Sequence, residues 1–247
     1  MPIEDVRLTR RSFLSASATA TLFLAGCTTT PPVKTPEVVA VKPALPRGPV
    51  SDAELALRYA AVEDSGHLIP AIPYQQMDSK FFRQRVVDPT GERPGTVVVD
   101  TSTRFLYLTE PGGTAMRYGV GIGRDGFSWQ GEGIIHWRQP WPRWKPPADM
   151  IKRRPDLEKY SVENGGMAPG IKNPLGARAL YIFQNKQDTL YRLHGTPEWR
   201  SIGKAVSSGC VRLINQDVLD LYKRVPHHAR IVVRHTPLPA VQEVAGA

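Results

Sequence analysis

The stretch LHGTPEWRSIGKAVSSGCVRL, residues 193 to 213, holds a histidine and a cysteine that fifteen residues separate, His194 and Cys210. A free thiol has a pKa of about 8.5, so only a few per cent of it is thiolate at neutral pH. An imidazole within hydrogen-bond reach can take the thiol proton and give a thiolate–imidazolium pair. His194 ends a predicted strand and Cys210 leads into a short extended piece at 211–213, so the loop between them can bring both side chains together. Cys210 is therefore a candidate nucleophile with His194 as general base and acid, and a buried structural cysteine is the alternative.

The residues directly before the cysteine add a second chemical element. In Ser207-Ser208-Gly209-Cys210 the glycine allows a sharp backbone turn, so the N–H groups of Gly209 and Cys210 could point at an incoming carbonyl oxygen. The loss of such an oxyanion hole typically costs about 3–4 kcal/mol of barrier. A cysteine–histidine pair with these donors performs acyl transfer, in which a thioester forms and water or an amine then captures it.

The first 27 residues read as an export signal and not as part of the fold. A charged segment with Arg10-Arg11 precedes an apolar, small-residue run that is about half the roughly 20 residues needed to span a bilayer. The string TRRSFL at 9–14 resembles the twin-arginine pattern for export of folded proteins, and an ordinary Sec signal is the alternative. We therefore expect an exported protein of the periplasm or cell envelope.

The string LAGC at 24–27 resembles the bacterial lipobox, in which the cysteine is acylated and becomes the mature N-terminus. Residues 28–50 are rich in Thr, Val and Pro and have no helical or strand period, which is typical of a semi-rigid tether. A plain cleavage site with an incidental cysteine is the alternative. The chain has 2 cysteines, so lipidation of Cys27 leaves Cys210 without an intramolecular disulfide partner. We expect attachment to a membrane through a lipid anchor on Cys27.

Beyond residue 50 the pattern is that of one mainly β domain preceded by an N-terminal extension at 51–94. Residues 51–61 read as a short helix capped by Ser51 or Asp52. A second helix is predicted at 216–225, with Asn215 as N-cap and Asp217 in its positive first turn. Strands about every ten residues, with turns between them, indicate an antiparallel sandwich or barrel with a few short helices. The predicted strands are 96–99, 104–109, 114–122, 133–138, 179–184, 190–194 and 230–234.

Two long loops interrupt the predicted strands. One is rich in Trp and Pro (QPWPRWKPP, 139–147), and the other is rich in Gly and Pro (NGGMAPGIKNPLG, 164–176). Long loops without regular structure in a compact domain are usually functional or mobile. Trp137, Trp141 and Trp144 either pack against the sheet or form a substrate wall, and the sequence leaves both open.

The residues around His194 and Cys210 closely resemble the signature of the L,D-transpeptidase family of the YkuD/ErfK type. The matching strings are HGT at 194–196 and SSGCVRL at 207–213, followed by Asn215 and Asp217. The resemblance extends to the hairpin at 97–108, to QPWP at 139–142 with PPADM at 146–150, and to NPLG at 173–176, and it covers roughly residues 94–235. It implies a mostly β catalytic domain at 95–235, followed by a tail at 236–247.

The resemblance also implies a reaction: that of a peptidoglycan L,D-transpeptidase, a cysteine acyltransferase that needs no cofactor. Cys210 would attack the carbonyl of the diamino acid at the third position of a stem peptide and expel the terminal D-alanine. The thioester would then pass to an amine on a neighbouring stem peptide or on a wall-attached protein. His194 matches the general base, and the carbonyl of Gly195 would orient its imidazole. Arg212 and Ser208 are the candidate substrate-binding residues; Arg212 matches a position linked to the substrate's carboxylate.

The sequence departs from the family pattern at two positions and leaves other functions open. Ser208 stands where many members have His, and Pro197 where many have Asn. Helix capping explains Asn215 and Asp217 without a catalytic role. Pairing of Arg212 with a buried carboxylate is an equal alternative to substrate binding. The same Cys–His pair would also serve an L,D-carboxypeptidase or wall-link hydrolase, and a degenerate site would leave a lipid-tethered peptidoglycan-binding module.

The basic composition does not indicate nucleic acid as a partner. The formal net charge is +9, but Lys and Arg are spread along the chain and no nucleic-acid-binding motif is present. The histidines do not show the His-x-x-x-His spacing of a zinc site, so no metal is expected.

Overall fold

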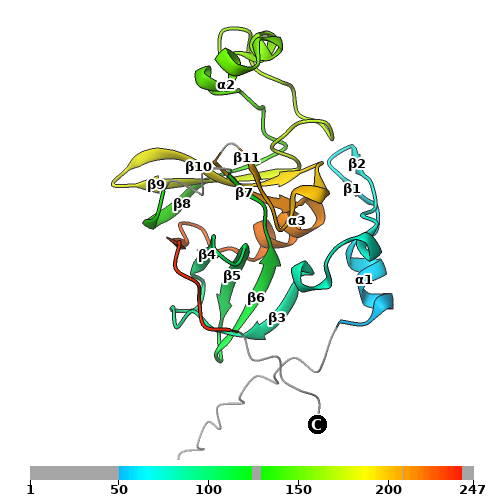
Figure 1. Cartoon of the computed structure of the whole chain (residues 1–247), viewed down its shortest axis with the longest axis vertical. Helices are drawn as coiled ribbons and strands as arrows, with labels where there is room; N and C mark the ends of the chain where they lie inside the picture. The colour runs from blue at the N-terminus through cyan, green and yellow to red at the C-terminus, as the bar shows by residue number, and fades with distance from the viewer. Residues whose placement is uncertain (1–49, 124–128, 208, 241–247) are drawn as a thin grey trace, which may run out of the picture. The chain divides into compact units, whose positions relative to one another are not determined.

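The computed structural model describes residues 50–123, 129–207 and 209–240 (Figure 1). The predicted export signal, the lipobox cysteine Cys27 and the tether up to residue 49 lie outside the described residues, as do Ser208 and residues 241–247 of the predicted tail. Within the described part, no helix has the length and hydrophobicity that a membrane-spanning segment needs.

A large mixed sheet forms the centre of the described chain. Nine of the described strands join in the order β12-β10-β9-β8-β13-β4-β5-β6-β3, and most neighbours are antiparallel. The pairs β10–β12 and β13–β4 are parallel, so the predicted mainly β class with few short helices is confirmed but the sheet is mixed and not wholly antiparallel. The strands are β3 (Gln84–Val87), β4 (Val97–Asp100), β5 (Phe105–Glu110), β6 (Thr114–Gly119), β8 (Gly131–Pro140), β9 (Arg178–Gln184), β10 (Gln187–Thr196), β12 (Val211–Ile214) and β13 (Arg230–Arg234).

Smaller elements surround this sheet. Two short strand pairs are β1 (Val62–Asp64) with β2 (His67–Ile69), and β7 (Ile122–Gly123) with β11 (Ala205–Ser207). The α-helices are α1 (Asp52–Arg58), α2 (Ala148–Arg153) and α3 (Asn215–Arg224). Single 3-10 turns occur at Tyr74–Gln76, Ser79–Phe81, Pro155–Tyr160 and Trp199–Ser201. Figure 1 shows α3 against the strands and α2 standing away from them.

Alternation along the strands assigns their side chains to two faces. On one face, Leu180 and Ile182 of β9 and Leu193 of β10 are fully buried and pack with Val218 and Leu221 of α3. Burial of such side chains stabilises the fold by about 1.5–3 kcal/mol each. This cluster explains why α3 lies against β9 and β10. The opposite face of β8, β9, β10 and β12 is called the site face below.

The helix caps differ between the two predicted helices. The Ser51 hydroxyl accepts a hydrogen bond from the Glu54 backbone N–H at 3.3 Å, which confirms Ser51 as the cap of α1. The predicted cap at Asn215 is wrong, because α3 begins at Asn215 and its cap position, Ile214, makes no side-chain hydrogen bond. The Asn215 side chain is buried and its oxygen accepts from the Ala177 N–H at 3.0 Å, so it ties the helix to the preceding loop.

The N-terminal extension, residues 51–94, packs onto the main sheet and α3. Asp64 accepts hydrogen bonds from both terminal nitrogens of Arg178 at 2.8 Å and from Trp141 Nε1 at 2.7 Å. Tyr59 of the extension is buried in one cluster with Ile214. The β1–β2 hairpin and the helix α1 are therefore held to the sheet by a bidentate ion pair and by apolar contact.

Candidate active site

Strand pairing brings His194 and Cys210 to neighbouring positions. In the parallel pair β10–β12, Leu193 lies opposite Val211 and His194 opposite Arg212. Cys210 directly precedes β12, so the same register continued by one residue places it opposite Arg192. Residues two apart on a strand share a face, and so do cross-strand partners. Arg192, His194, Arg212 and Cys210 therefore gather on the site face, where burial of Leu193 and Val211 on the other face fixes the register.

His194 is buried and oriented by the next residue in the chain. Its Nδ1 lies 2.6 Å from the carbonyl oxygen of Gly195. A carbonyl oxygen can only accept, so Nδ1 carries the proton and the other ring nitrogen, Nε2, is the acceptor in the neutral imidazole. Burial, together with the positive charges of Arg212 and Arg192, lowers the pKa of His194 to about 4, although the hydrogen bond to Gly195 raises it. The imidazole is therefore neutral at pH 7.

Cys210 is a free thiol in a partly buried position. Its Sγ lies 4.0 Å from the carbonyl oxygen of Leu190. Burial raises the pKa of the Cys210 thiol, whereas the charge and the backbone N–H of Arg192 and the charge of Arg212 lower it. Thiol and imidazole are both neutral in this state, which differs from the predicted thiolate–imidazolium pair because burial penalises both charged forms.

Gly209, which is expected to form the oxyanion hole with Cys210, has an unusual backbone conformation. Gly209 has φ of +123°, a conformation that favours glycine, and a β-carbon there would lie 3.6 Å from the ring of Tyr191. Ser208, a candidate substrate-binding residue, lies outside the described residues. The N–H groups of Gly209 and Cys210 stay predicted donors.

Arg212 sits at the edge of the site with one carboxylate partner. Its Nη1 donates to Glu198 at 2.8 Å, and the Glu198 side chain is exposed while that of Arg212 is mostly buried. The sequence left open that Arg212 pairs with a buried carboxylate. Arg212 does pair with a carboxylate, but this carboxylate faces solvent. The charge of Arg212 still acts on both His194 and Cys210, as their pKa values show.

Hydrogen bonds and a close backbone approach hold the two predicted loops together and against the strand that carries His194. Asn173 is buried, and its amide nitrogen donates to the carbonyls of Pro142 and Ala168 at 3.0 Å, which joins the two loops. Gly176, at φ +59°, leaves no room for a β-carbon, which would overlap the Asn215 amide oxygen and the backbone of Gly195. The NPLG string therefore allows the close approach that holds the strand of His194 in place.

The three tryptophans differ in their burial. Trp141 is buried and its indole lies 4.0 Å from the ring of His67, centre to centre, so it packs. Trp144 is partly buried near Tyr160, at 6.3 Å between ring centres. Trp137 lies on the site face with 56% of its surface exposed.

Sequence reasoning missed Arg192 and Asp64. Arg192 is two residues before His194, so strand alternation alone would have placed its charge on the same face. No local signal marks Asp64, because its partners Arg178 and Trp141 are distant in the chain. Among the described residues, no group of three or more His, Cys, Asp or Glu side chains could hold a metal ion.

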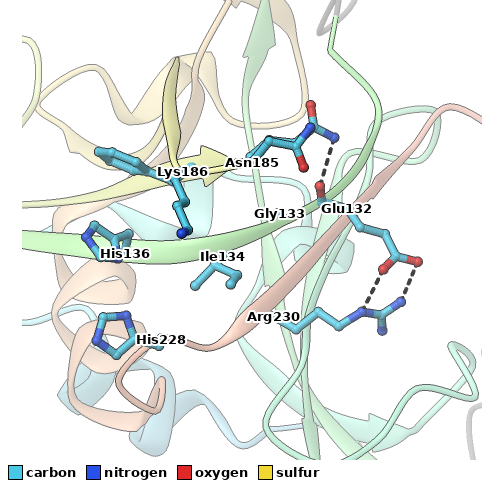
Figure 2. A pocket seen from close by; sticks show the side chains of 10 residues that line it. Glu132, Gly133, Ile134, His136, Asn185, Lys186, His228 and Arg230 are labelled. Atoms are coloured by element: carbon cyan, nitrogen blue, oxygen red, sulfur yellow. Dashed lines mark hydrogen bonds and ion pairs between the residues drawn. The ribbon is translucent and has the colours of Figure 1, made fainter.

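A separate hollow of about 860 Å³ lies between β8, β13 and the β9–β10 turn, and Figure 2 shows it. Its lining includes Ile134, His136, Lys186 and His228, and does not include His194 or Cys210.

Comparison with known proteins identifies the family of residues 94–233. The family model for the L,D-transpeptidase catalytic domain (YkuD) matches residues 94–233. The chain belongs to this family. It is 30% identical over 169 residues to "Probable L,D-transpeptidase YbiS" of Escherichia coli strain K12, which covers 66% of this chain and 52% of the relative. It is 29% identical over 171 residues to "Probable L,D-transpeptidase ErfK/SrfK" of the same strain, with 66% and 51% covered. The chain thus spans about half the length of these curated relatives.

Solved structures give weaker overall matches. A Brucella melitensis protein described as a probable carnitine operon oxidoreductase is 45% identical and covers 62% of this chain and 94% of its own, with a TM-score of 0.44. An L,D-transpeptidase from Mycobacterium smegmatis is 17% identical, with 56% and 58% covered and a TM-score of 0.41.

Proposed function

We propose that this L,D-transpeptidase family member is a peptidoglycan L,D-transpeptidase that works through a thioester on Cys210. Nε2 of His194 takes the thiol proton as Sγ attacks the carbonyl of the diamino acid at the third stem position. The carbon–nitrogen bond to the terminal D-alanine breaks, and the proton passes from His194 to the leaving amine. An acceptor amine, on a stem peptide or a wall-attached protein, then attacks the thioester and gives its proton back through His194 to the thiol.

The parallel pairing of β10 with β12 is the observation that carries this proposal. It puts the nucleophile and the base on one face, and the Gly195 carbonyl fixes the base as the tautomer that can accept a proton. Arg192 and Arg212 place positive charge beside the thiol, where negative charge develops during attack. In this proposal Arg212, freed from the exposed Glu198, and Ser208 contact the substrate, and the N–H groups of Gly209 and Cys210 bind the oxyanion.

Intact-mass measurement of the exported domain with a disaccharide tetrapeptide tests the proposal. The wild-type protein is expected to gain the mass of the donor less D-alanine, and Cys210→Ala is expected to gain none. His194→Gln should form the adduct at least about 100 times more slowly. Leu57→Ala is the matched control, because this exposed residue lies on α1. Failure of the wild-type protein to acquire any adduct would argue for a non-catalytic binding module.

The products distinguish the acceptors that the same chemistry allows. Cross-linked dimers show transfer to a stem amine, whereas tripeptide alone shows capture by water and thus an L,D-carboxypeptidase. A protein acceptor appears as a shifted mass on a wall protein.

We also propose that the chain is exported and anchored in the cell envelope by a lipid on Cys27, with residues 28–50 as tether, 51–94 as extension, 95–235 as catalytic domain and 236–247 as tail. The LAGC string after an apolar run supports this arrangement. Labelling with a fatty-acid analogue tests it: label is expected on the wild-type chain and absent from Cys27→Ser.

A further inference from the structure

A β-bulge in β8 turns two neighbouring side chains to the site face. Ile135 pairs with Ile182, and Trp137 pairs with Tyr181, so His136 is an extra residue between them. Both residues of such a bulge can face the same side of the sheet. His136 and Trp137 are exposed, whereas Ile135 is fully buried, which agrees with this arrangement.

Trp137 is the far end of a row of stacked side chains that begins beside the nucleophile. The rings of Trp137 and Tyr181 stack with centres 5.0 Å apart at 23°, and the Arg192 guanidinium lies 4.8 Å from the centre of the Tyr181 ring. Arg192 is opposite Cys210 in the continued register of β12. Three strand spacings separate Cys210 from Trp137, or about 14 Å.

The hollow of about 860 Å³ (Figure 2) is lined by His136, the neighbour of Trp137 in β8, and by Phe183, two residues from Tyr181 in β9. Its apolar floor includes Ile134 and Phe183, which pair across β8 and β9. His136, from the bulge, lies 4.8 Å from the Phe183 ring and 5.1 Å from the His228 ring, centre to centre. Figure 2 shows Lys186, His136 and His228 extending into the same space, while Arg230 points to Glu132.

The lining of the hollow suits a neutral, polyhydroxylated ligand more than a strongly anionic one. Arg230 is neutralised by ion pairs to Glu132 and Glu92, and the Gln184 amide donates to the Glu132 carbonyl at 3.0 Å. Imidazole, ammonium and amide groups beside apolar and aromatic rings can bind hydroxyl and acetamido groups while a ring face packs against the sugar. A volume of this size accommodates a disaccharide.

We propose that Trp137 and this hollow bind the sugars of the peptidoglycan strand whose stem peptide is presented to Cys210. The proposal rests on the proposed function, and it adds a glycan-binding site to it. In the proposed donor the acylated residue is third in the stem, and three extended residues span about 10 Å before the link to the sugar. That reach covers most of the ~14 Å from Cys210 to Trp137, and the link to the sugar and the sugar ring span the rest.

Direct binding of a peptide-free GlcNAc–MurNAc disaccharide, with its lactyl carboxyl capped as a neutral amide, tests the site independently of the reaction. Heteronuclear NMR titration of the Cys210→Ala protein is expected to shift the signals of Trp137 and His136. Trp137→Ala should raise Kd at least about fivefold, Trp137→Phe should recover part of it, and the control Leu57→Ala should not change it. His228→Asn, which tolerates the positive φ of 55° at this position, should also weaken binding.

Kinetics then link the site to the donor. The ratio of kcat/KM for disaccharide tetrapeptide to kcat/KM for bare tetrapeptide is expected to fall about fivefold in Trp137→Ala. An unchanged ratio, or an unchanged Kd for the disaccharide in Trp137→Ala, overturns the glycan site while leaving the thioester mechanism intact. Loss of all turnover in the wild-type protein overturns the mechanism instead, and the NMR titration still decides the glycan site.

Discussion

Replacement of Asp217 by Asn is expected to remove a pH-dependent cost from the stability of the fold. Asp217 lies in the first turn of α3 and is fully buried, and both carboxylate oxygens lack a hydrogen-bond partner among the described residues. Burial raises the pKa of Asp217 to about 7, while the charge of Arg83, at 3.7 Å, lowers it and that of Asp220 raises it. Asp217 lies in the first turn of α3 as predicted, but burial raises its pKa so that the carboxyl holds its proton below about pH 7.

The size of the effect follows from linkage. The pKa of Asp217 is raised from 3.8 to about 7, so the folded state holds a proton that the unfolded state has released between these pH values. Its contribution to stability is fully present below about pH 4 and is lost as pH rises to about 7. A tenfold change in a proton-binding constant is about 1.4 kcal/mol, so the loss amounts to at most about 4 kcal/mol. The amide of Asn carries no charge at any of these pH values.

Urea unfolding at pH 4.5, 6 and 8 measures the effect. The free energy of unfolding of Asp217→Asn should increase relative to that of wild type by about 3–4 kcal/mol from pH 4.5 to pH 8, because only wild type loses stability over this range. Any pH-independent change in the free energy of unfolding that repacking causes cancels in this difference. Arg83 keeps its ion pair to Asp220 at 3.2 Å in the variant. Asp149→Asn, at an exposed position on α2, is the matched control and should show no such trend.

Parallel stability curves for wild type and Asp217→Asn over this pH range would refute the reasoning. They would mean that the carboxyl is ionised in the folded state at pH 4.5, despite its burial, or that water reaches it.

Further expectations concern the site and its support. The acidic limb of kcat/KM against pH should fall near pH 4, the pKa of His194 in the free enzyme, and a limb near 6.5 would contradict its burial. Arg192→Gln should move that limb upward and slow alkylation of the thiol by iodoacetamide at pH 8, because the arginine lowers both pKa values. Gly176→Ala should lower the free energy of unfolding by more than about 3 kcal/mol, whereas Gly165→Ala, at φ +81° with nothing within 4 Å, should cost about 1 kcal/mol; equal losses would exclude the steric argument. Asp64→Ala should cost about 2 kcal/mol in the same urea assay and loosen the extension to limited proteolysis, and an unchanged cleavage pattern would contradict its anchoring role.

The sequence predicts the strands well where side chains alternate between a buried and an outer face. The structure has strands at all seven predicted positions. β4 and β6 are buried on both faces, so the turn residues that bound them mark these two strands. The parallel pairs β10–β12 and β13–β4 could not be read from this pattern, since alternation carries no information on strand direction. The helix at α3 was predicted, but its start was not, because Asn215 serves a long-range hydrogen bond to Ala177 in place of a local cap.

At the site, the sequence predicts which residues come together better than it predicts whether their side chains are charged. Gly195 was expected to orient the imidazole, and its carbonyl does accept from Nδ1 of His194. The neutral state of the thiol and imidazole could not be predicted, because it depends on how completely the folded chain excludes water from both groups. The exposure of Trp137 is a similar case: the bulge at His136 decides it, and a bulge leaves no mark in the alternation of residue types.

The charges of Arg192 and Arg212 act in opposite directions on the two reacting groups. They disfavour the imidazolium of His194 and favour the thiolate of Cys210, while burial disfavours both charged forms. In the proposed reaction the negative charge moves from sulfur to the carbonyl oxygen and stays near these arginines, so they stabilise it throughout the attack. The imidazolium, by contrast, is penalised for as long as it lasts. Transfer of its proton to the departing D-alanine amine relieves that penalty, and so does its return to sulfur, so the site shortens the life of the imidazolium in both directions of the proposed reaction.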